Sequence, residues 1–167
     1  NNALRPHILH VINGLSRGGT ETALLRHIED TLGIYRHTII SLTSLDQMRG
    51  EFEALAGVSV FLLRANRGVP DPRLLFRCTR LIRLLKPDLV HAWLPLSWLI
   101  STVACRFACG VHIPLVWSAR SLIMGTKHRF SEVIALRLCR AMSGQCDALV
   151  ANSHVALCQL NQYGFRP

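Results

Sequence analysis

Residues 7–25 read HILHVINGLSRGGTETALL and contain the parts of a strand–loop–helix unit. The short apolar run His7–Ile12 predicts a strand, which an Asn-Gly pair ends. A glycine pair, Gly18 and Gly19, follows, and the segment 20–33 then carries leucine and isoleucine at helical spacing. A strand, a glycine-containing loop and an amphipathic helix in this order begin an α/β unit.

The same alternation of strand and helix continues along the chain. Further strands are expected at 38–42, 58–63, 88–92, 114–118 and 147–151. Helices are expected at 48–56, at 71–86, from the end of strand 88–92 to about 108, at 127–142 and at 153–163. Several of these strands, such as 148–151, are apolar on both faces, which is typical of a parallel sheet covered by helices on each side. The sequence therefore predicts a Rossmann-like, doubly wound, mostly parallel sheet with helices on both faces.

The helix that starts after Asp71 has the clearest sequence signals. Asp71 can cap the free amides, Pro72 suits the first helical position, and Pro87 ends the helix. One arc of this helix carries Leu74, Leu75, Cys78, Leu81, Ile82 and Leu85, and the opposite arc carries Arg73, Arg77, Arg80 and Arg83. This pattern predicts an amphipathic helix with an arginine-rich outer face.

Composition narrows the class of protein and of partner. The chain has 167 residues, of which 50% are hydrophobic and 17% charged, which excludes a disordered or coiled-coil chain. The net charge of +9 favours an anionic partner. The uncharged stretch 89–105 is interrupted by Pro95 and is better explained by a strand and a helix than by a membrane span.

The six cysteines are expected to be reduced and buried, as in a cytoplasmic protein. They do not form a Cys-x-x-Cys pair, and the chain is large enough to fold without disulfides. His, Cys and acidic residues also lack convincing metal-ligand spacing, so we expect no metal and no other cofactor.

Ligands of such sheets collect beyond the carboxyl ends of the strands. The loops that decide function are therefore 13–20, 91–95, 118–125 and 152–153. In the first of them, Gly18 and Gly19 would let the main chain approach a ligand, and the helix that follows would direct its free N–H groups at a phosphate. Neither the Gly-x-Gly-x-x-Gly fingerprint nor a P-loop is present, and a flexible strand-to-helix turn is the alternative.

Four segments together resemble the retaining glycosyltransferases of family 4. They are GGTE at 18–21, KPDLVHA at 86–92, IPLVWS at 113–118 and CDALVANS at 146–153. They occur in the order and at the spacings of that family, and the resemblance covers essentially the whole chain. The family has the GT-B architecture of two Rossmann-like domains.

The resemblance implies that residues 1–167 are the N-terminal, acceptor-side domain of a longer enzyme. In this family the N-terminal half shapes the acceptor pocket and its glycine loop approaches the donor diphosphate. The C-terminal half binds the nucleotide sugar and carries paired glutamates, which do not follow in this sequence. We therefore expect a retaining sugar transfer from a nucleotide-diphosphate sugar to a glycan or lipid-linked hydroxyl, and no turnover by this domain alone.

One candidate catalytic residue departs from the family pattern. Where many relatives present a histidine after the fifth strand, this chain has Arg120. An arginine stays protonated and cannot act as a general base, but it could bind a sugar hydroxyl or neutralise the departing phosphate. A solvated loop arginine is the alternative.

The remaining candidate residues are assigned to the acceptor and substrate cleft. They are Thr20, Glu21, His91, Trp93, Ser118, Ser121 and Ser153. Structural explanations compete for four of them. Glu21 can stabilise its helix N-terminus, and Ser153 can cap the last helix. His91 can bond a neighbouring main chain, and Trp93 can be a core residue.

The expected partners follow from the same resemblance and from charge. They are a nucleotide-diphosphate sugar, a glycan or lipid-linked acceptor and an anionic membrane surface, with no nucleic acid. Membrane contact would use the arginine face with Lys127, Arg129, Arg137 and Arg140, at the cytoplasmic side, although a solvated surface explains these charges too. The alternative function is a non-catalytic Rossmann-like module that binds a nucleotide or a protein.

Overall fold

A computed structural model describes residues 5–65, 71–108, 110, 112–119 and 130–166. The strands are β1 (His7–Ile12), β2 (Arg36–Thr43), β3 (Ser59–Ala65), β4 (Leu89–Trp93), β5 (Leu115–Ala119) and β6 (Ala148–Ala151). The helices are α1 (Gly19–Thr31), α2 (Arg49–Glu53), α3 (Pro72–Leu85), α4 (Pro95–Ala108), α5 (Phe130–Met142) and α6 (His154–Gln162), with a 3-10 turn η2 (Ser143–Gln145). The predicted alternation of strands and helices is confirmed in these segments.

The described strands form one sheet in the order β3-β2-β1-β4-β5-β6. Every neighbouring pair is parallel. The strand order reverses between β1 and β4, because the chain first winds outward to β3 and then returns to the other side of β1. The predicted Rossmann-like, doubly wound sheet is therefore confirmed.

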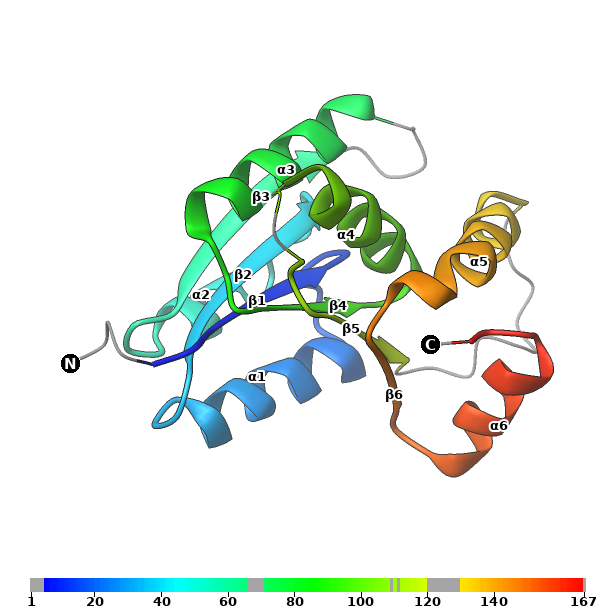
Figure 1. Cartoon of the computed structure of the whole chain (residues 1–167). Coiled ribbons are helices and arrows are strands. Elements are labelled where there is room, and N and C mark those ends of the chain that lie inside the picture. The colour runs from blue at the N-terminus through cyan, green and yellow to red at the C-terminus, as the bar shows by residue number, and fades with distance from the viewer. Residues whose placement is uncertain (1–4, 66–70, 109, 111, 120–129, 167) are drawn as a thin grey trace.

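Helices cover both faces of the sheet, as Figure 1 shows. α3 and α4 lie on one face and α1 on the other. On the α4 side the core includes Trp98 and Trp117, whose rings stack at 5.3 Å and 4°. On the α1 side a smaller core includes Leu24, Ile28 and Phe52.

Helix α3 has the limits that its sequence signals predicted. The Asp71 side chain accepts a hydrogen bond from the main-chain N–H of Arg73 at 2.9 Å, and Pro72 is the first helical residue. The helix ends before Lys86, which adopts a left-handed conformation with φ 45°. The buried arc contains Leu74, Cys78 and Ile82, and the arginine arc is exposed.

Two burial expectations were wrong. Strand β6 was expected to be covered on both faces, but it is the edge strand and Val150 is 50% exposed. The described cysteines were expected to be buried, but Cys158 is exposed on α6 because it lies on the outer side of the last helix. The cysteines of the described segments are free thiols. Among the described residues, no helix has both the length and the apolar character needed to cross a membrane.

Candidate functional site

The loops after β1 and β4 meet at the position where the strand order reverses. β1 and β4 are parallel neighbours, with Ile12 paired to Trp93, so both strands end at the same edge of the sheet. In open α/β sheets this reversal leaves a crevice beyond the strand ends in which ligands bind. The loop that carries Gly18 and Gly19 therefore lies at the position expected of a binding site.

The first part of this loop is fastened to the segment that connects β2 with α2. The N–H of Leu15 donates to the carbonyl of Leu45 at 2.8 Å, and the N–H of Met48 donates to the carbonyl of Leu15 at 2.9 Å. Gly14 allows the close approach, because a Cβ there would lie 2.6 Å from Thr43 Oγ1. The loop is therefore held in place by main-chain bonds before any ligand binds.

Glu21 is buried beneath the glycine pair. Its Oε1 accepts a hydrogen bond from Ser16 Oγ at 2.6 Å, and its side chain is in contact range of Gly18. A Cβ at Gly18 would lie 2.7 Å from Glu21 Oε2. Glu21 lies in the first turn of α1, where a carboxylate is favourable, and its side chain holds the preceding loop in place. Contact of Glu21 with a substrate stays a prediction.

Helix α1 begins with main-chain donors that the helix cannot satisfy. The first intrahelical bond runs from the N–H of Thr22 to the carbonyl of Gly18, so the N–H groups of Gly19, Thr20 and Glu21 precede it. Gly19 is exposed, and a Cβ built on it meets nothing within 4 Å. These groups can donate to an anion that enters the crevice from solvent.

Three features of this site were not foreseen from the sequence. Asn13 Oδ1 accepts a hydrogen bond from the N–H of Ser97 at 3.0 Å and so joins the β1 loop to the start of α4. Leu94, between β4 and α4, has φ 79°, which is unusual for leucine and marks a constrained turn. Arg17 lies beside Gly18 and forms a 2.7 Å ion pair with Glu51. Their only sequence signal was their place in loops at strand ends.

Of the residues assigned to the cleft, Trp93 and Ser118 are buried. Trp93 is 2% exposed and Ser118 is 3% exposed, and the two are register partners on β4 and β5. The ring of Trp93 packs into the core under α1, in agreement with its structural explanation, and contact of Trp93 with a substrate stays a prediction. His91 lies within β4, not at its end, with its ring 4.5 Å from that of Trp93.

Ser153 and Thr20 lie at the starts of helices, as predicted. Ser153 caps α6 by accepting a hydrogen bond from the N–H of Ala156 at 3.1 Å, and it remains exposed. Thr20 is half-buried in the first turn of α1. Arg120 and Ser121 lie outside the described residues.

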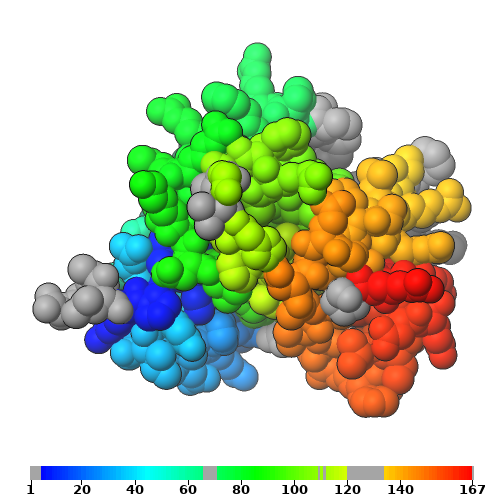
Figure 2. Space-filling view, viewed as in Figure 1, coloured from blue at the N-terminus to red at the C-terminus, as the bar shows by residue number. Residues whose placement is uncertain are grey.

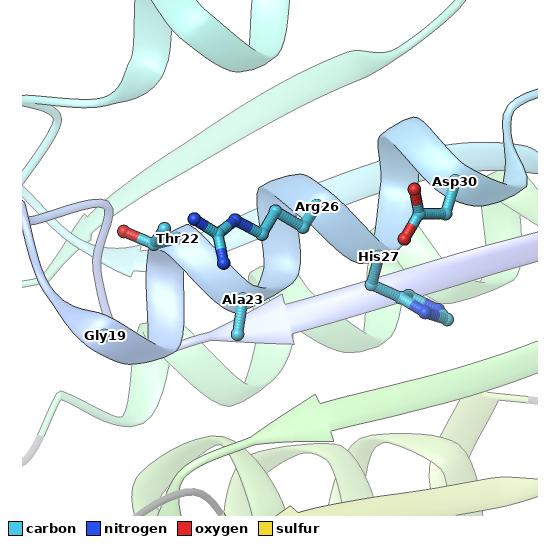
Figure 3. Close-up of a pocket in the computed structure, with 6 residues that line it drawn as sticks. All are labelled: Gly19, Thr22, Ala23, Arg26, His27 and Asp30. Carbon is cyan, nitrogen blue, oxygen red and sulfur yellow. The ribbon is translucent and has the colours of Figure 1, made fainter.

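An open groove runs along α1 away from the glycine pair. It has a volume of about 580 Å³. Its lining consists of Gly19, Thr22, Ala23, Arg26, His27 and Asp30. Figure 3 shows that these residues follow the helix from its N-terminus toward its C-terminal half.

Histidine rings gather on the sheet beneath α1. Burial lowers the pKa of His10 well below its usual value of 6.5, and the neighbouring rings of His91, His37 and His27 lower that pKa further. Burial also lowers the pKa of His37. Both rings are therefore neutral at pH 7. Within the described part of the chain, no cluster of three or more His, Cys, Asp or Glu residues has the arrangement of a metal site.

A model of the sequences of glycosyltransferase family 4 matches residues 6–167 of this chain. The chain belongs to glycosyltransferase family 4. The Rossmann-like fold and the resemblance to an N-terminal domain of this family agree with that match. A comparison with curated proteins finds no match.

Solved structures support the GT-B type of fold for this family 4 chain. Anabaena HepE, in complex with UDP and glucose, has 17% identity and a TM-score of 0.71, and the match covers 95% of this chain and 41% of HepE. A putative UDP-N-acetylglucosamine 2-epimerase from Listeria monocytogenes has 17% identity and a TM-score of 0.64, covering 98% and 43%. Acinetobacter baumannii MurG has 14% identity and a TM-score of 0.57, covering 87% and 41%. The chain thus spans about two fifths of each of these proteins.

Proposed function

We propose that this chain is the acceptor-side domain of a retaining glycosyltransferase. The enzyme would move a sugar from a nucleotide-diphosphate sugar to a hydroxyl of a glycan or lipid-linked acceptor. A second domain, outside residues 1–167, would hold most of the donor, and the crevice above β1 and β4 would receive its diphosphate. On this proposal the 167-residue chain folds but does not turn over.

One observation carries the proposal: N–H groups that have no intrahelical partner begin α1 at the switch point of a family 4 chain. A diphosphate leaving group gains negative charge as the sugar bond breaks. Donors fixed in advance at that position stabilise the charge without having to reorganise. Gly18 and Gly19 supply the approach, and the bonds that fasten residue 15 to residues 45 and 48 supply the rigidity.

The other candidate residues would act at the strand ends or in the core beside the crevice. Arg120 would neutralise the departing phosphate, and the phosphate would itself accept the proton of the acceptor hydroxyl. Thr20, Ser121 and Ser153 would contact substrate from the loops at the strand ends. Glu21 and Trp93 would act through the loop and the core that they support. No cofactor or metal is invoked.

The donor role of Gly19 can be tested without changing the helix. Gly19→Pro removes the N–H, but proline is well tolerated at the first helical position. The preceding residue, Gly18, has φ −151° and ψ 173°, which proline requires of its neighbour. A hydrogen bond to a charged group contributes about 1.5–3 kcal/mol, so the dissociation constant of UDP should rise about tenfold or more.

The matched control is Gly19→Ala, which keeps the N–H and meets open space. Titration of UDP, followed by the amide NMR signals of residues 14–22, measures both variants against the unchanged chain. Equal UDP affinity in the proline and alanine variants would contradict a phosphate contact at Gly19. Sugar transfer from UDP-glucose by the 167-residue chain alone would contradict the assignment as half of an active site.

We also propose that the enzyme works in the cytoplasm, attached peripherally to an anionic membrane. The outer arc of α3 combines Arg73 and Arg80 with the apolar side chains of Phe76, 69% exposed, and Leu84, 73% exposed. The exposed Phe107 lies next to this arc, because Arg83 donates hydrogen bonds to the carbonyls of Phe107 and Ala108 at the end of α4. Figure 2 shows α3 and α4 together forming the upper part of the surface.

Two arginines of this arc give a clean test of membrane attachment. Each basic residue near an anionic surface contributes about 1 kcal/mol, so R73A/R80A should weaken binding to phosphatidylserine vesicles about thirtyfold. The control R26A/R36A removes the same charge from exposed positions outside α3. An equal loss of vesicle affinity in both variants would contradict an oriented membrane surface. Binding of the unchanged chain to neutral vesicles as strong as to phosphatidylserine vesicles would also contradict it.

A further inference from the structure

Four histidine rings from four elements converge between the sheet and α1. They are His10 on β1, His37 on β2, His91 on β4 and His27 on α1. The ring centre of His10 lies 5.3 Å from that of His37, 5.5 Å from that of His91 and 5.7 Å from that of His27. His10 is completely buried, and His27 lines the groove along α1.

Hydrogen bonds connect part of this cluster in one direction. Trp93 Nε1, which can only donate, lies 3.3 Å from His10 Nδ1. His10 Nδ1 must therefore accept, and a neutral His10 carries its proton on Nε2. That Nε2 lies 3.0 Å from His37 Nδ1, so His37 Nδ1 accepts in turn and His37 carries its proton on Nε2.

The series of bonds ends on α1. His37 Nε2 lies 3.2 Å from Thr31 Oγ1, and Thr31 Oγ1 donates to the carbonyl of His27. Trp93 thus donates first, and His10, His37 and Thr31 each accept from one neighbour and donate to the next, up to the last turn of α1. We name this series, Trp93–His10–His37–Thr31, the histidine relay.

The relay is complete only while both rings are neutral. A second proton on His10 would point from Nδ1 at the N–H of Trp93, and a second proton on His37 would point from Nδ1 at the N–H of His10. Either proton replaces a hydrogen bond by two opposed donors in a buried place, which is costly. The lowered pKa values of His10 and His37 agree with this arrangement.

The charged and titratable neighbours do not offset such a proton at the centre of the relay. They are His27, Arg26 and Asp30 on α1, Tyr35 just before β2, Arg36 at its start, His91 on β4, and His7 on β1 with Asp88 just before β4. Asp30 is the carboxylate of this set on α1. It lines the outer groove with His27, whereas the His10 ring is completely buried, so Asp30 does not compensate a proton on His10.

We propose that the histidine relay is an acid-sensitive latch: its rings lie between the sheet and α1, so protons on His10 and His37 can be hydrated only when α1 moves away, and α1 stays on the sheet while both rings are neutral. The latch acts at the C-terminal half of α1, and the helix carries Gly19 at its other end. If the proposed diphosphate site is correct, release of α1 would also remove the N–H donors of that site. The latch itself does not depend on that function.

Hydrogen exchange of the whole 167-residue chain tests the latch. Protection factors, corrected for intrinsic rates, are compared between pH 7.5 and 5.5 for the amides of α1 and of α3. At one pH unit below 6.5, each histidine that must stay neutral disfavours the closed state about tenfold. The protection of α1 should therefore fall at least tenfold more than that of the α3 amides that exchange by local opening, because such openings leave the rings buried. Equal falls in both helices would overturn the proposal.

Two further measurements separate the latch from general acid sensitivity. His37→Asn keeps an acceptor near the position of Nδ1 but cannot titrate, so the extra pH dependence of α1 should decrease by about tenfold, and His10 should account for the remainder. The control His154→Asn changes an exposed histidine at the start of α6 and should retain it. Nitrogen chemical shifts of the unchanged chain at pH 7.5 should show protons on Nε2 of His10 and His37. A proton on His10 Nδ1 would overturn the relay even if the variants do not fold.

UDP binding at pH 7.5 distinguishes this proposal from the proposed function. A chain that binds UDP but shows no selective opening of α1 in acid retains the function and loses the latch. A chain that opens α1 in acid but does not bind UDP retains the latch and loses the diphosphate site.

Discussion

The two faces of the sheet are held together by different physical means. On the face covered by α3 and α4, the core is mostly apolar, and Trp98 stacks on Trp117 and meets the Phe165 ring edge-on. On the face covered by α1, a smaller apolar core lies beside the histidine relay. Burial of hydrocarbon does not depend on protonation, whereas a relay of neutral imidazoles does.

The two helix layers should therefore respond differently to the same change of solvent. The α4 face should lose stability when a buried side chain is truncated and leaves a cavity. The α1 face should lose stability when its histidines take up protons. The α1 face is also the one that carries the glycine loop of the candidate site.

Trp98→Ala should cause the largest loss of stability. Trp98 is completely buried, and truncation of a buried aromatic side chain costs about 3–5 kcal/mol. The loss of unfolding free energy, measured with denaturant, should be equal at pH 7.5 and 5.5. Phe107→Ala, at a 60% exposed position, is the control and should stay within about 0.5 kcal/mol. A loss of unfolding free energy in Trp98→Ala that differed between pH 7.5 and 5.5 would contradict the proposed difference between the two faces.

Acidification should weaken the α1 face. Because the pKa of His10 is lowered on folding, the unfolded chain takes up the proton first as the pH falls below 6.5. Stability is thus full above that pH and declines below it, down to the lowered pKa of the folded state. At pH 5.5 His10 alone costs about 1.4 kcal/mol relative to neutral pH.

His10→Gln provides the test of that assignment. The variant should be less stable than the unchanged chain at pH 7.5, because Trp93 loses its acceptor, but its stability should fall less between pH 7.5 and 5.5. Denaturant unfolding at both pH values measures the difference. An unchanged pH dependence would assign the acid sensitivity to other groups.

The N-terminal caps of α3 and α1 differ, and Asp71→Ala should expose the difference. Asp71 caps α3 with its side chain, whereas the N-cap of α1 is Gly18, which has no side chain to do so. Loss of a side-chain cap costs about 1 kcal/mol, so Asp71→Ala should lower the unfolding free energy by that amount. Ser153→Ala, at the cap of α6, should cost a similar amount. No loss at Asp71 would mean that packing alone positions α3.

The smallest effect is expected within the glycine pair. Gly18→Ala places a Cβ 2.7 Å from Glu21 Oε2, but a carboxylate at the end of a flexible side chain can move, so the cost should stay below about 1 kcal/mol. Gly19→Ala meets open space and should be neutral or slightly stabilising. Thermal unfolding of the two variants measures the difference. Equal stabilities would show that Glu21 does not need the space at Gly18.

Much of this fold could be predicted because its signals are local. The capped and proline-started α3 has the limits that Asp71 and Pro87 indicated. Failures occurred where neighbours in space decide the outcome. Strand β6 has an apolar sequence but lies at the sheet edge, and the sequence left open whether Trp93 belongs to the cleft or to the core, where its ring lies.

The sequence by itself determined the succession of strands and helices, the glycine pair at the first strand end and the membership of glycosyltransferase family 4. These properties depend on the types and spacing of residues that are close together along the chain. Only the tertiary structure decided that His10, His27, His37 and His91 share one place and that Trp93 fixes the proton positions in the relay. The reason is physical: four elements distant in sequence are brought together by strand order, and one sequence carries no direct record of which strands are neighbours.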